Sequence, residues 1–256
     1  MRLFVVKIFL IFIFFLNFPG AFSQNIKADT STELPALRNT LNVYHKFLSP
    51  ETGLYNGSEY VYTAYYPFAI NEGHPYFQEK LFDTGAVFYN NVIYEKVPLM
   101  FDLINEKLLI RDPTSVNIIT LNNERIMWFI IRGHTFVKLH MDSVAHTNMP
   151  GGFYDLLYSG ATPLYKKMSK RLMNITDTYF GVKQYVTESN DYFIKKNNQY
   201  YKITNKKGLL HILNNKTVAQ FIRKNKLSLK SDKDDALKKI VAYYDSISSI
   251  NIKSDN

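Results

Sequence analysis

The residues best suited to chemistry lie among tight turns and apolar runs in residues 73–112. His74 sits between a glycine and a proline, which build a rigid turn able to aim an imidazole, and Asp83 could orient it as a general base. No nucleophile accompanies this pair, because the chain has no cysteine, no G-x-S-x-G and no S-x-x-K. We expect no catalytic residue, and a hydrolase with a His74/Asp83 site stays open as an alternative.

Two further sets of polar residues suggest chemistry by their types. Asp102 and Glu106 could resemble the acid/base pair of a glycosidase, but Glu106 falls in a predicted hairpin loop, where acidic residues are common. His134, His140 and His146 are evenly spaced, yet six residues along a strand span about 20 Å. Zinc needs its ligating nitrogens about 2 Å away, so we expect neither a metal nor another cofactor.

The second half of the chain offers a basic surface with aromatic residues nearby. The candidate binding residues are Lys195, Lys196, Lys206, Lys207, Arg223, Lys224 and Lys226. Lysine outnumbers arginine there, and arginine is the better reader of phosphate and base, so nucleic acid is not the expected partner. An anionic envelope component, such as lipid headgroups or acidic polysaccharide, or another protein, is the alternative to a solvated face without a ligand.

An aromatic run, YNGSEYVYTAYYPF, begins at Tyr55. As a strand, it would place Tyr60, Tyr62 and Ala64 on one face and the residues between them on the other. We interpret these tyrosines as core, since aromatic side chains are mostly buried. The alternative is a small-ligand carrier with an aromatic-lined β interior.

Short strands separated by turns must position these residues. Strands are expected at residues 86–89, 92–94, 97–103, 107–111, 116–121, 125–131, 135–139, 153–158, 179–187, 192–196 and 199–204. Asn90-Asn91 and Asn197-Asn198 tolerate positive φ and so predict hairpin turns. Helical spacing predicts a helix over residues 34–48, a short helix around Val218 and a last helix that begins with a Ser231/Asp234 capping box.

The chain opens with a basic start, an apolar run over residues 8–16, a Pro-Gly break and Ala21-Phe22-Ser23. This order is typical of a secretory signal, and the run is too short for a spanning helix of about 20 residues. We therefore expect export to the periplasm or the extracellular space, with no transmembrane segment after cleavage. The absence of cysteine excludes disulfides.

Charge is unevenly distributed along the mature chain. Residues 24–160 carry a net charge of −4, and residues 161–256 carry +11. This contrast predicts three segments: a signal peptide over residues 1–23, a helix plus β-rich domain over residues 24–160, and a basic C-terminal region over residues 161–256.

Three sets of residues resemble a known group of proteins. They are residues 54–60 with Gly73-His74-Pro75-Tyr76-Phe77, residues 85–102, and residues 221–227 with residues 241–246. The pattern resembles uncharacterised, signal-peptide-bearing envelope proteins of Gram-negative bacteria. That resemblance implies export and implies no activity or site residue.

Together these patterns predict an α+β fold. We expect an N-terminal helix, an antiparallel β-meander forming a sandwich or a partly closed barrel, and a basic C-terminal part with a small antiparallel hairpin and two to three helices. The expected function is an exported non-enzymatic envelope protein with a binding or structural role.

Overall fold

The computed structural model describes residues 53–112, 115–140, 149–177 and 181–254. All described residues belong to one compact unit, which falls within Glu51–Asn256. The expected signal peptide and the expected helix over residues 34–48 therefore lie outside the described residues.

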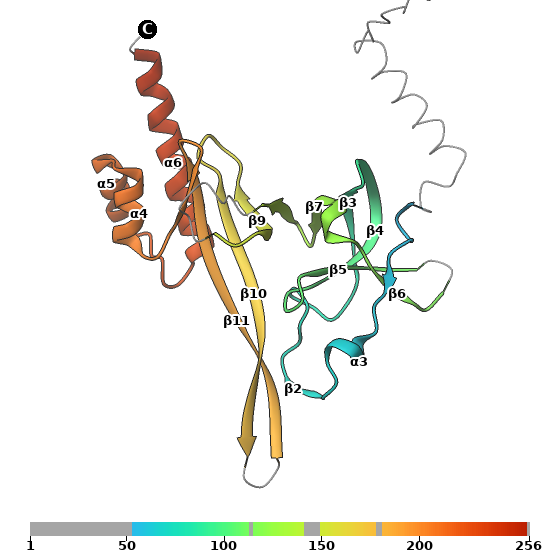
Figure 1. Ribbon diagram of the computed structural model, residues 1–256. Helices are drawn as coiled ribbons and strands as arrows, with labels where there is room; N and C mark the ends of the chain where they lie inside the picture. The colour runs from blue at the N-terminus through green and yellow to red at the C-terminus, as the bar shows by residue number, and fades with distance from the viewer. Residues whose placement is uncertain (1–52, 113–114, 141–148, 178–180, 255–256) are drawn as a thin grey trace, which may run out of the picture. The chain divides into compact units, whose positions relative to one another are not determined.

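One mostly antiparallel sheet contains the described strands (Figure 1). Its strands are β1 (Ser58–Glu59), β2 (Ile70–Glu72), β3 (Asp83–Tyr89), β4 (Val92–Asp102), β5 (Lys107–Arg111), β6 (Ile118–Thr120), β7 (Ile126–Ile131), β8 (His134–Leu139), β9 (Gly152–Tyr158), β10 (Leu164–Asp177), β11 (Gly181–Lys196) and β12 (Gln199–Lys202). They lie in the order β1-β6-β5-β4-β3-β7-β8-β9-β10-β11-β12, and β2 pairs in parallel with β11. The predicted antiparallel meander is confirmed, but the sheet is open, so the expected sandwich or partly closed barrel is corrected.

The predicted turn chemistry accounts for the hairpins. Asn90 and Asn91, between β3 and β4, have φ values of 53° and 64°, and Asn197 and Asn198, between β11 and β12, have φ values of 51° and 60°. Paired positive φ values suit the right-handed twist of the flanking strands. The expected strands 92–94 and 97–103 form the single strand β4, because a bulge at Lys96 (φ 57°) keeps the pairing with β3.

The aromatic run differs from its expected strand. Only Ser58–Glu59 pairs, and Tyr62–Tyr65 form the short helix α3. Helical spacing brings the rings of Tyr62 and Tyr66 to 4.9 Å. Tyr60 and Tyr66 are buried as expected, whereas Tyr62 and Tyr65 are exposed. The core interpretation therefore holds for two of these tyrosines and is wrong for the other two.

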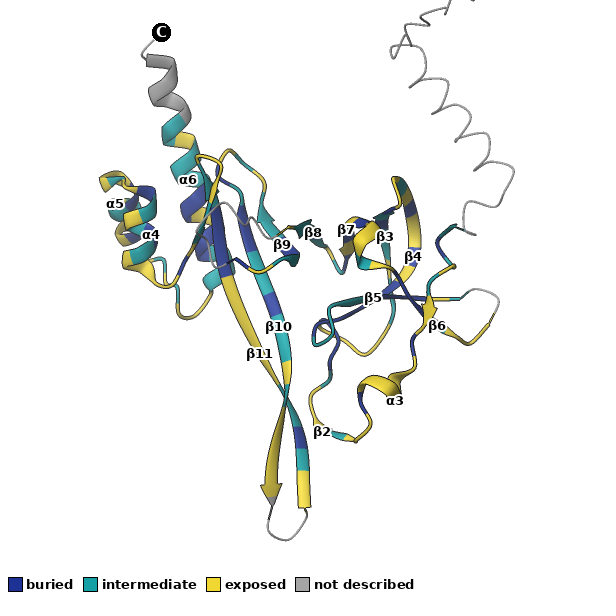
Figure 2. Cartoon of the chain, in the orientation of Figure 1, coloured by how far each residue is buried: buried dark blue, intermediate teal, exposed yellow. Residues whose placement is uncertain are grey.

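The longest hairpin was not anticipated from the sequence. β10 and β11 pair continuously from Leu164↔Ile194 to Asp177↔Gly181, so β11 also covers the break expected between residues 187 and 192. In β11, the residues from Thr187 to Asp191 are exposed (Figure 2). Because β10 has no clear apolar alternation, its strand depends on the register with β11. β9 and β10 also pair across Gly160, the expected domain boundary.

Three helices follow the sheet, within the expected two to three. They are α4 (Lys206–Leu213), α5 (Lys216–Lys224) and α6 (Lys233–Ser254). The side chain of Asp232, and not Ser231, caps α6 by accepting from the Asp235 N–H at 3.2 Å, which corrects the predicted capping box.

Two main clusters of buried side chains hold these elements. The larger one fills the sheet from β3 to β9, where the rings of Phe101, Phe129 and Phe136 contact one another at 4.8–5.2 Å. The other packs Leu237 and Ile240 of α6 against α4, α5 and the sheet residue Ile194. The aromatic side chains of the β region therefore fill a core by contacting one another.

Candidate functional site

His74 and Asp83 have separate partners in the structure. The backbone carbonyl of His74 accepts from Lys170 Nζ at 3.2 Å, and the His74 ring stacks on Tyr76. Asp83 accepts from the Thr84 N–H and forms an ion pair with Arg132 at 3.8 Å. No hydrogen bond or ion pair joins the two described side chains, so the structure does not bring the candidate base of the alternative hydrolase site into contact with its orienting acid.

Burial and the Lys170 charge lower the pKa of His74 below its ordinary value. Its Nδ1 atom is buried and has no hydrogen-bond partner among the described residues. A neutral imidazole satisfies this environment, because protonation would place a charge near Lys170 and Lys80. We interpret His74 as part of the packing between its turn and β10.

The structure does form a histidine–carboxylate pair elsewhere. His134 Nδ1 lies 2.7 Å from Asp155 Oδ2, and the Asp155 side chain is 2% exposed. The register of β8 and β9 creates this pair, since Asp155 lies opposite Phe136, two residues from His134. Sequence reasoning missed it because strand register could not be derived from the spacing of the two residues.

The other ring nitrogen of His134, Nε2, also has a polar neighbour. Gln78 Nε2 lies 3.3 Å from His134 Nε2, and Phe77 packs edge-on against the ring at 5.1 Å. If Nδ1–H donates to Asp155, Nε2 accepts from the Gln78 amide, an assignment that follows from the hydrogen-bond network. A general base needs the proton of a nucleophile at that nitrogen, and the Gln78 side chain lies there instead. We interpret the pair as a contact that connects the loop of Phe77 and Gln78 to β8 and β9.

The two carboxylates of the β4–β5 hairpin are also occupied by structural contacts. Asp102 is fully buried and accepts from Tyr60 Oη at 2.9 Å, Tyr66 Oη at 2.7 Å and three donors of the following turn. Glu106 accepts from the Phe153 N–H at 2.8 Å and from Lys167 Nζ. These contacts replace the interpretation of Glu106 as a solvated loop acid and leave no acid/base pair.

Metal ligation finds no support in the described part of the chain. No group of three or more histidine, aspartate or glutamate side chains there could hold an ion. Of the evenly spaced histidines, His134 pairs with Asp155, and His140 lines a cavity of about 280 Å³ with Glu106 and Lys138. His146 lies outside the described residues.

The predicted basic residues separate into two groups. Lys196 Nζ donates to the carbonyls of Ile212 and Leu213 at 2.9 and 3.2 Å, at the end of α4. A cation there satisfies carbonyls without helical partners and interacts favourably with the helix dipole. Lys195 lies over the Tyr200 ring at 5.4 Å. These two lysines are therefore partly engaged within the fold.

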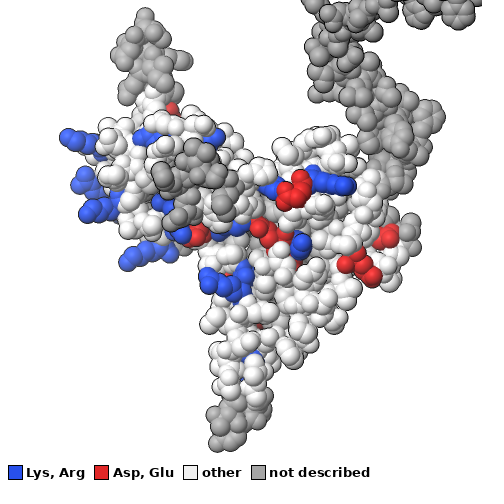
Figure 3. All heavy atoms as spheres, in the orientation of Figure 1, with Lys and Arg blue, Asp and Glu red and all other residues white. Residues whose placement is uncertain are grey.

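The remaining predicted residues are exposed and have no ion-pair partner among the described residues. Residues 203–231 contain no aspartate or glutamate. We name the Lys and Arg side chains of this segment the basic surface: Lys206, Lys207, Lys216, Arg223, Lys224, Lys226 and Lys230. Figure 3 shows positive side chains gathered over α4 and α5.

Local sequence explains why these cations face outward. Asn205 and Asn215 cap α4 and α5 by accepting backbone N–H groups at 2.9 Å. Each helix then buries a narrow apolar stripe, with Leu209 and Leu213 in α4, which leaves the charged positions on the other side. With no carboxylate nearby in sequence, the positive charges of this surface are not balanced locally.

A cavity of about 570 Å³ adjoins the basic surface where α4 and α6 begin. Lys206, Lys230 and Lys233 line it together with the apolar side chains of Leu227 and Leu229. Burial lowers the pKa of Lys233, whose Nζ lies 4.1 Å from the centre of the Tyr192 ring. The lining combines positive charge with apolar area and contains no carboxylate.

No described helix combines the length and the apolar composition required to cross a membrane. Comparison with protein-family models, with curated proteins and with solved structures found no match to this chain.

Proposed function

We propose that this chain is an exported, non-enzymatic protein of the bacterial envelope that binds anionic lipid headgroups through its basic surface. The observation that supports this function is the group of seven exposed cations in residues 203–231, which contain no acidic residue. Unpaired surface lysines attract an anionic membrane by about 1 kcal/mol for each residue near it. Several such contacts give reversible binding that weakens with salt.

The chemistry of the other candidate sites supports a binding role. His74 and Asp83 have separate partners, and His134 Nε2 faces the Gln78 amide. Six of the seven cations are lysines, which suit a diffuse anionic surface better than planar reading of bases. The resemblance to signal-peptide-bearing envelope proteins and the secretory type of N-terminus support the proposed location.

Co-sedimentation with vesicles tests this function. The mature chain should bind vesicles that contain phosphatidylglycerol, should not bind phosphatidylcholine vesicles, and should be released as salt increases. Changing Lys207→Glu, Arg223→Glu and Lys224→Glu should abolish binding. The matched control changes Lys80→Glu, Lys96→Glu and Arg125→Glu, which are exposed residues of the β region, and should retain most of it.

Equal loss in the two triple variants would show that only net charge matters and would refute a specific basic surface. Wild-type protein that ignores phosphatidylglycerol but binds an acidic polysaccharide, and loses this binding when Lys207, Arg223 and Lys224 are changed to Glu, would replace the lipid partner of the basic surface with a carbohydrate one. Wild-type protein that binds neither would refute the function.

A further inference from the structure

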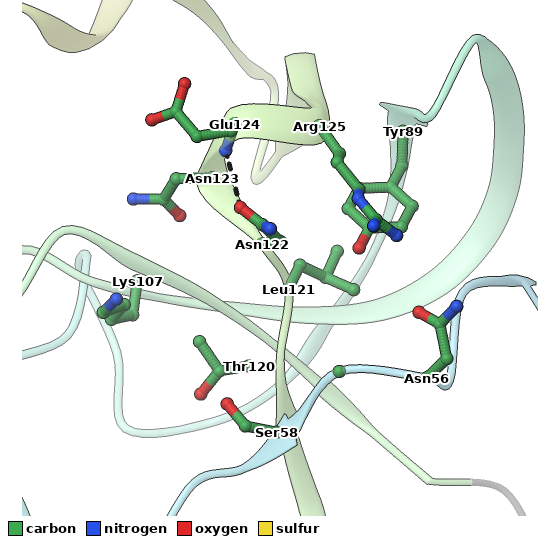
Figure 4. Close-up of a pocket in the computed structure, with 11 residues that line it drawn as sticks. Asn56, Ser58, Tyr89, Lys107, Thr120, Leu121, Asn122, Asn123, Glu124 and Arg125 are labelled. Carbon is green, nitrogen blue, oxygen red and sulfur yellow. Dashed lines mark hydrogen bonds between the residues drawn. The ribbon is translucent and has the colours of Figure 1, made fainter.

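A third cavity, of about 510 Å³ and with a mostly polar lining, lies where β1 joins the edge of the sheet (Figure 4). Hydroxyl, amide and cationic side chains dominate its wall. The lining side chains of this kind are Asn56, Ser58, Lys107, Thr120, Asn122, Asn123 and Arg125. Its size is in the range of small-molecule sites, and the basic surface contributes no residue to it.

Close approach of two backbones builds the floor of this cavity. A side chain at Gly57 would clash with the Thr120 carbonyl and with Ile119, so glycine lets β1 reach β6. The resulting register places Ser58 opposite Thr120. Figure 4 shows their hydroxyl oxygens next to each other, on the side of Lys107.

Two polar atoms in this wall lack hydrogen-bond partners among the described residues. Thr120 is 6% exposed, and its Oγ1 atom is buried and unpartnered. Asn123 Nδ2 donates to the Glu106 carbonyl at 2.6 Å, which fixes the amide orientation and leaves Asn123 Oδ1 buried without a donor. A buried polar group without a partner is unfavourable, so both atoms favour a ligand with hydroxyl groups.

The positive charges of the wall exceed its negative charge. Glu124 forms an ion pair with Lys138 at 2.8 Å, and the hydrogen bond from that lysine lowers the pKa of the glutamate. Lys107 and Arg125 have no ion-pair partner in the described ranges. Lys107 lies on the side of the unpartnered Thr120 hydroxyl, whereas Arg125 lies next to Tyr89 on the other side of Leu121 (Figure 4).

We propose that this cavity binds an acidic sugar residue, a ring with several hydroxyls and one carboxylate. Lys107 holds the carboxylate by charge-assisted hydrogen bonds. Sugar hydroxyls donate to Asn123 Oδ1 and exchange a hydrogen bond with Thr120 Oγ1, with Ser58 and Asn122 at the rim. A free uronate and the terminal unit of an acidic polysaccharide share this chemistry.

Titration followed by backbone amide NMR tests the site. Glucuronate should shift amides of residues 56–58 and 120–125 and should bind at least tenfold more tightly than glucose or acetate. Glucose has the hydroxyls without the carboxylate, and acetate has the carboxylate without the hydroxyls. A glucuronate tetramer distinguishes the free uronate from the polysaccharide. If the tetramer binds as tightly as the monomer, the end of a polysaccharide chain enters the cavity; if only the monomer binds, the ligand is a free uronate.

Substitutions separate the two kinds of contact. Lys107→Met should weaken glucuronate binding about tenfold and leave glucose binding unchanged, since only the carboxylate contact is lost. Thr120→Val keeps the side-chain shape and should weaken both sugars severalfold. Lys96→Met, at an exposed position of β4, is the control and should change neither.

Absence of amide shifts with glucuronate, equal affinity for acetate, or shifts confined to residues outside this wall would overturn the assignment. None of these outcomes depends on vesicle binding, which uses residues 203–231.

Discussion

Replacing Asp102 with alanine should cost more stability than removing any one of its partners. The carboxylate has no exposed surface and accepts five hydrogen bonds, from Tyr60 Oη, Tyr66 Oη, two backbone N–H groups and Asn105 Nδ2. It therefore joins the residues that flank α3 to β4 and to the β4–β5 turn. Alanine removes every acceptor at once and leaves these donors in place.

The expected loss of stability depends on what the substitution leaves behind. Deleting a donor removes its hydrogen bond as well, whereas deleting the acceptor leaves the donors buried without a partner. Each buried donor left without a partner costs about 1–3 kcal/mol. Two tyrosine hydroxyls alone therefore imply roughly 2–6 kcal/mol for Asp102→Ala, a large part of the roughly 5–15 kcal/mol of a typical domain. Tyr60→Phe deletes the donor together with its bond, so it should cost only about 1 kcal/mol.

Urea unfolding followed by circular dichroism measures both variants. Asp102→Ala should lower the unfolding midpoint clearly more than Tyr60→Phe, and Tyr66→Phe should resemble Tyr60→Phe. If the alanine variant loses no more stability than either phenylalanine variant, Asp102 is not the shared acceptor and the reasoning fails. Adding Tyr60→Phe and Tyr66→Phe to Asp102→Ala should recover part of the lost stability, because it removes the two hydroxyls that no longer have an acceptor.

Three further predictions concern charge. Lys196→Met should destabilise the protein by about 1 kcal/mol, because it uncaps α4, whereas Lys207→Met should change stability by less than about 0.5 kcal/mol; thermal unfolding compares them. Burial acts to raise the pKa of Asp234, but hydrogen bonds from Lys166 and Tyr192 outweigh it and leave that pKa lowered. Its stability contribution should be present above about pH 4 and lost as pH falls through the folded pKa. Acid denaturation of Asp234→Asn should lack this component, and an unchanged acid profile would contradict the assignment. Burial, followed by the influence of Asp102, raises the pKa of Tyr60 and Tyr66, so stability should be full below about pH 10 and decline above it as unfolded tyrosines ionise. The phenolate absorbance of these two tyrosines should rise only when the protein unfolds. Ionisation of either tyrosine in the folded protein at about pH 10 would contradict this prediction.

The pattern of the sequence predicted the elements whose residues alternate and end at recognisable turns. Asn90-Asn91 and Asn197-Asn198 marked two hairpins that the structure contains. β10 escaped prediction because its lysines and small polar residues become a strand only through pairing with β11. The helix α3 escaped because aromatic residues favour strands in general, whereas ring contacts at helical spacing decide this case.

The contacts of individual polar residues depended on register and position, which composition does not specify. The pairing of His134 with Asp155 arises from two strands joined through residues 140–151, and no spacing rule predicts it. The basic character of residues 203–231 could be counted directly. The distinction between Lys196, which caps α4, and the exposed Lys207 required the end of α4 to be located.

The central claim is that one surface of this protein, and not its overall charge, contacts an anionic membrane. Lysine-specific chemical labelling, quantified by mass spectrometry with and without phosphatidylglycerol vesicles, measures that contact residue by residue. Vesicles should protect Lys206, Lys207, Lys216, Lys224 and Lys226, and labelling of Lys80 and Lys96 should stay constant. Bound protein in which Lys80 and Lys96 are protected, while the lysines of the basic surface remain fully reactive, would contradict the account.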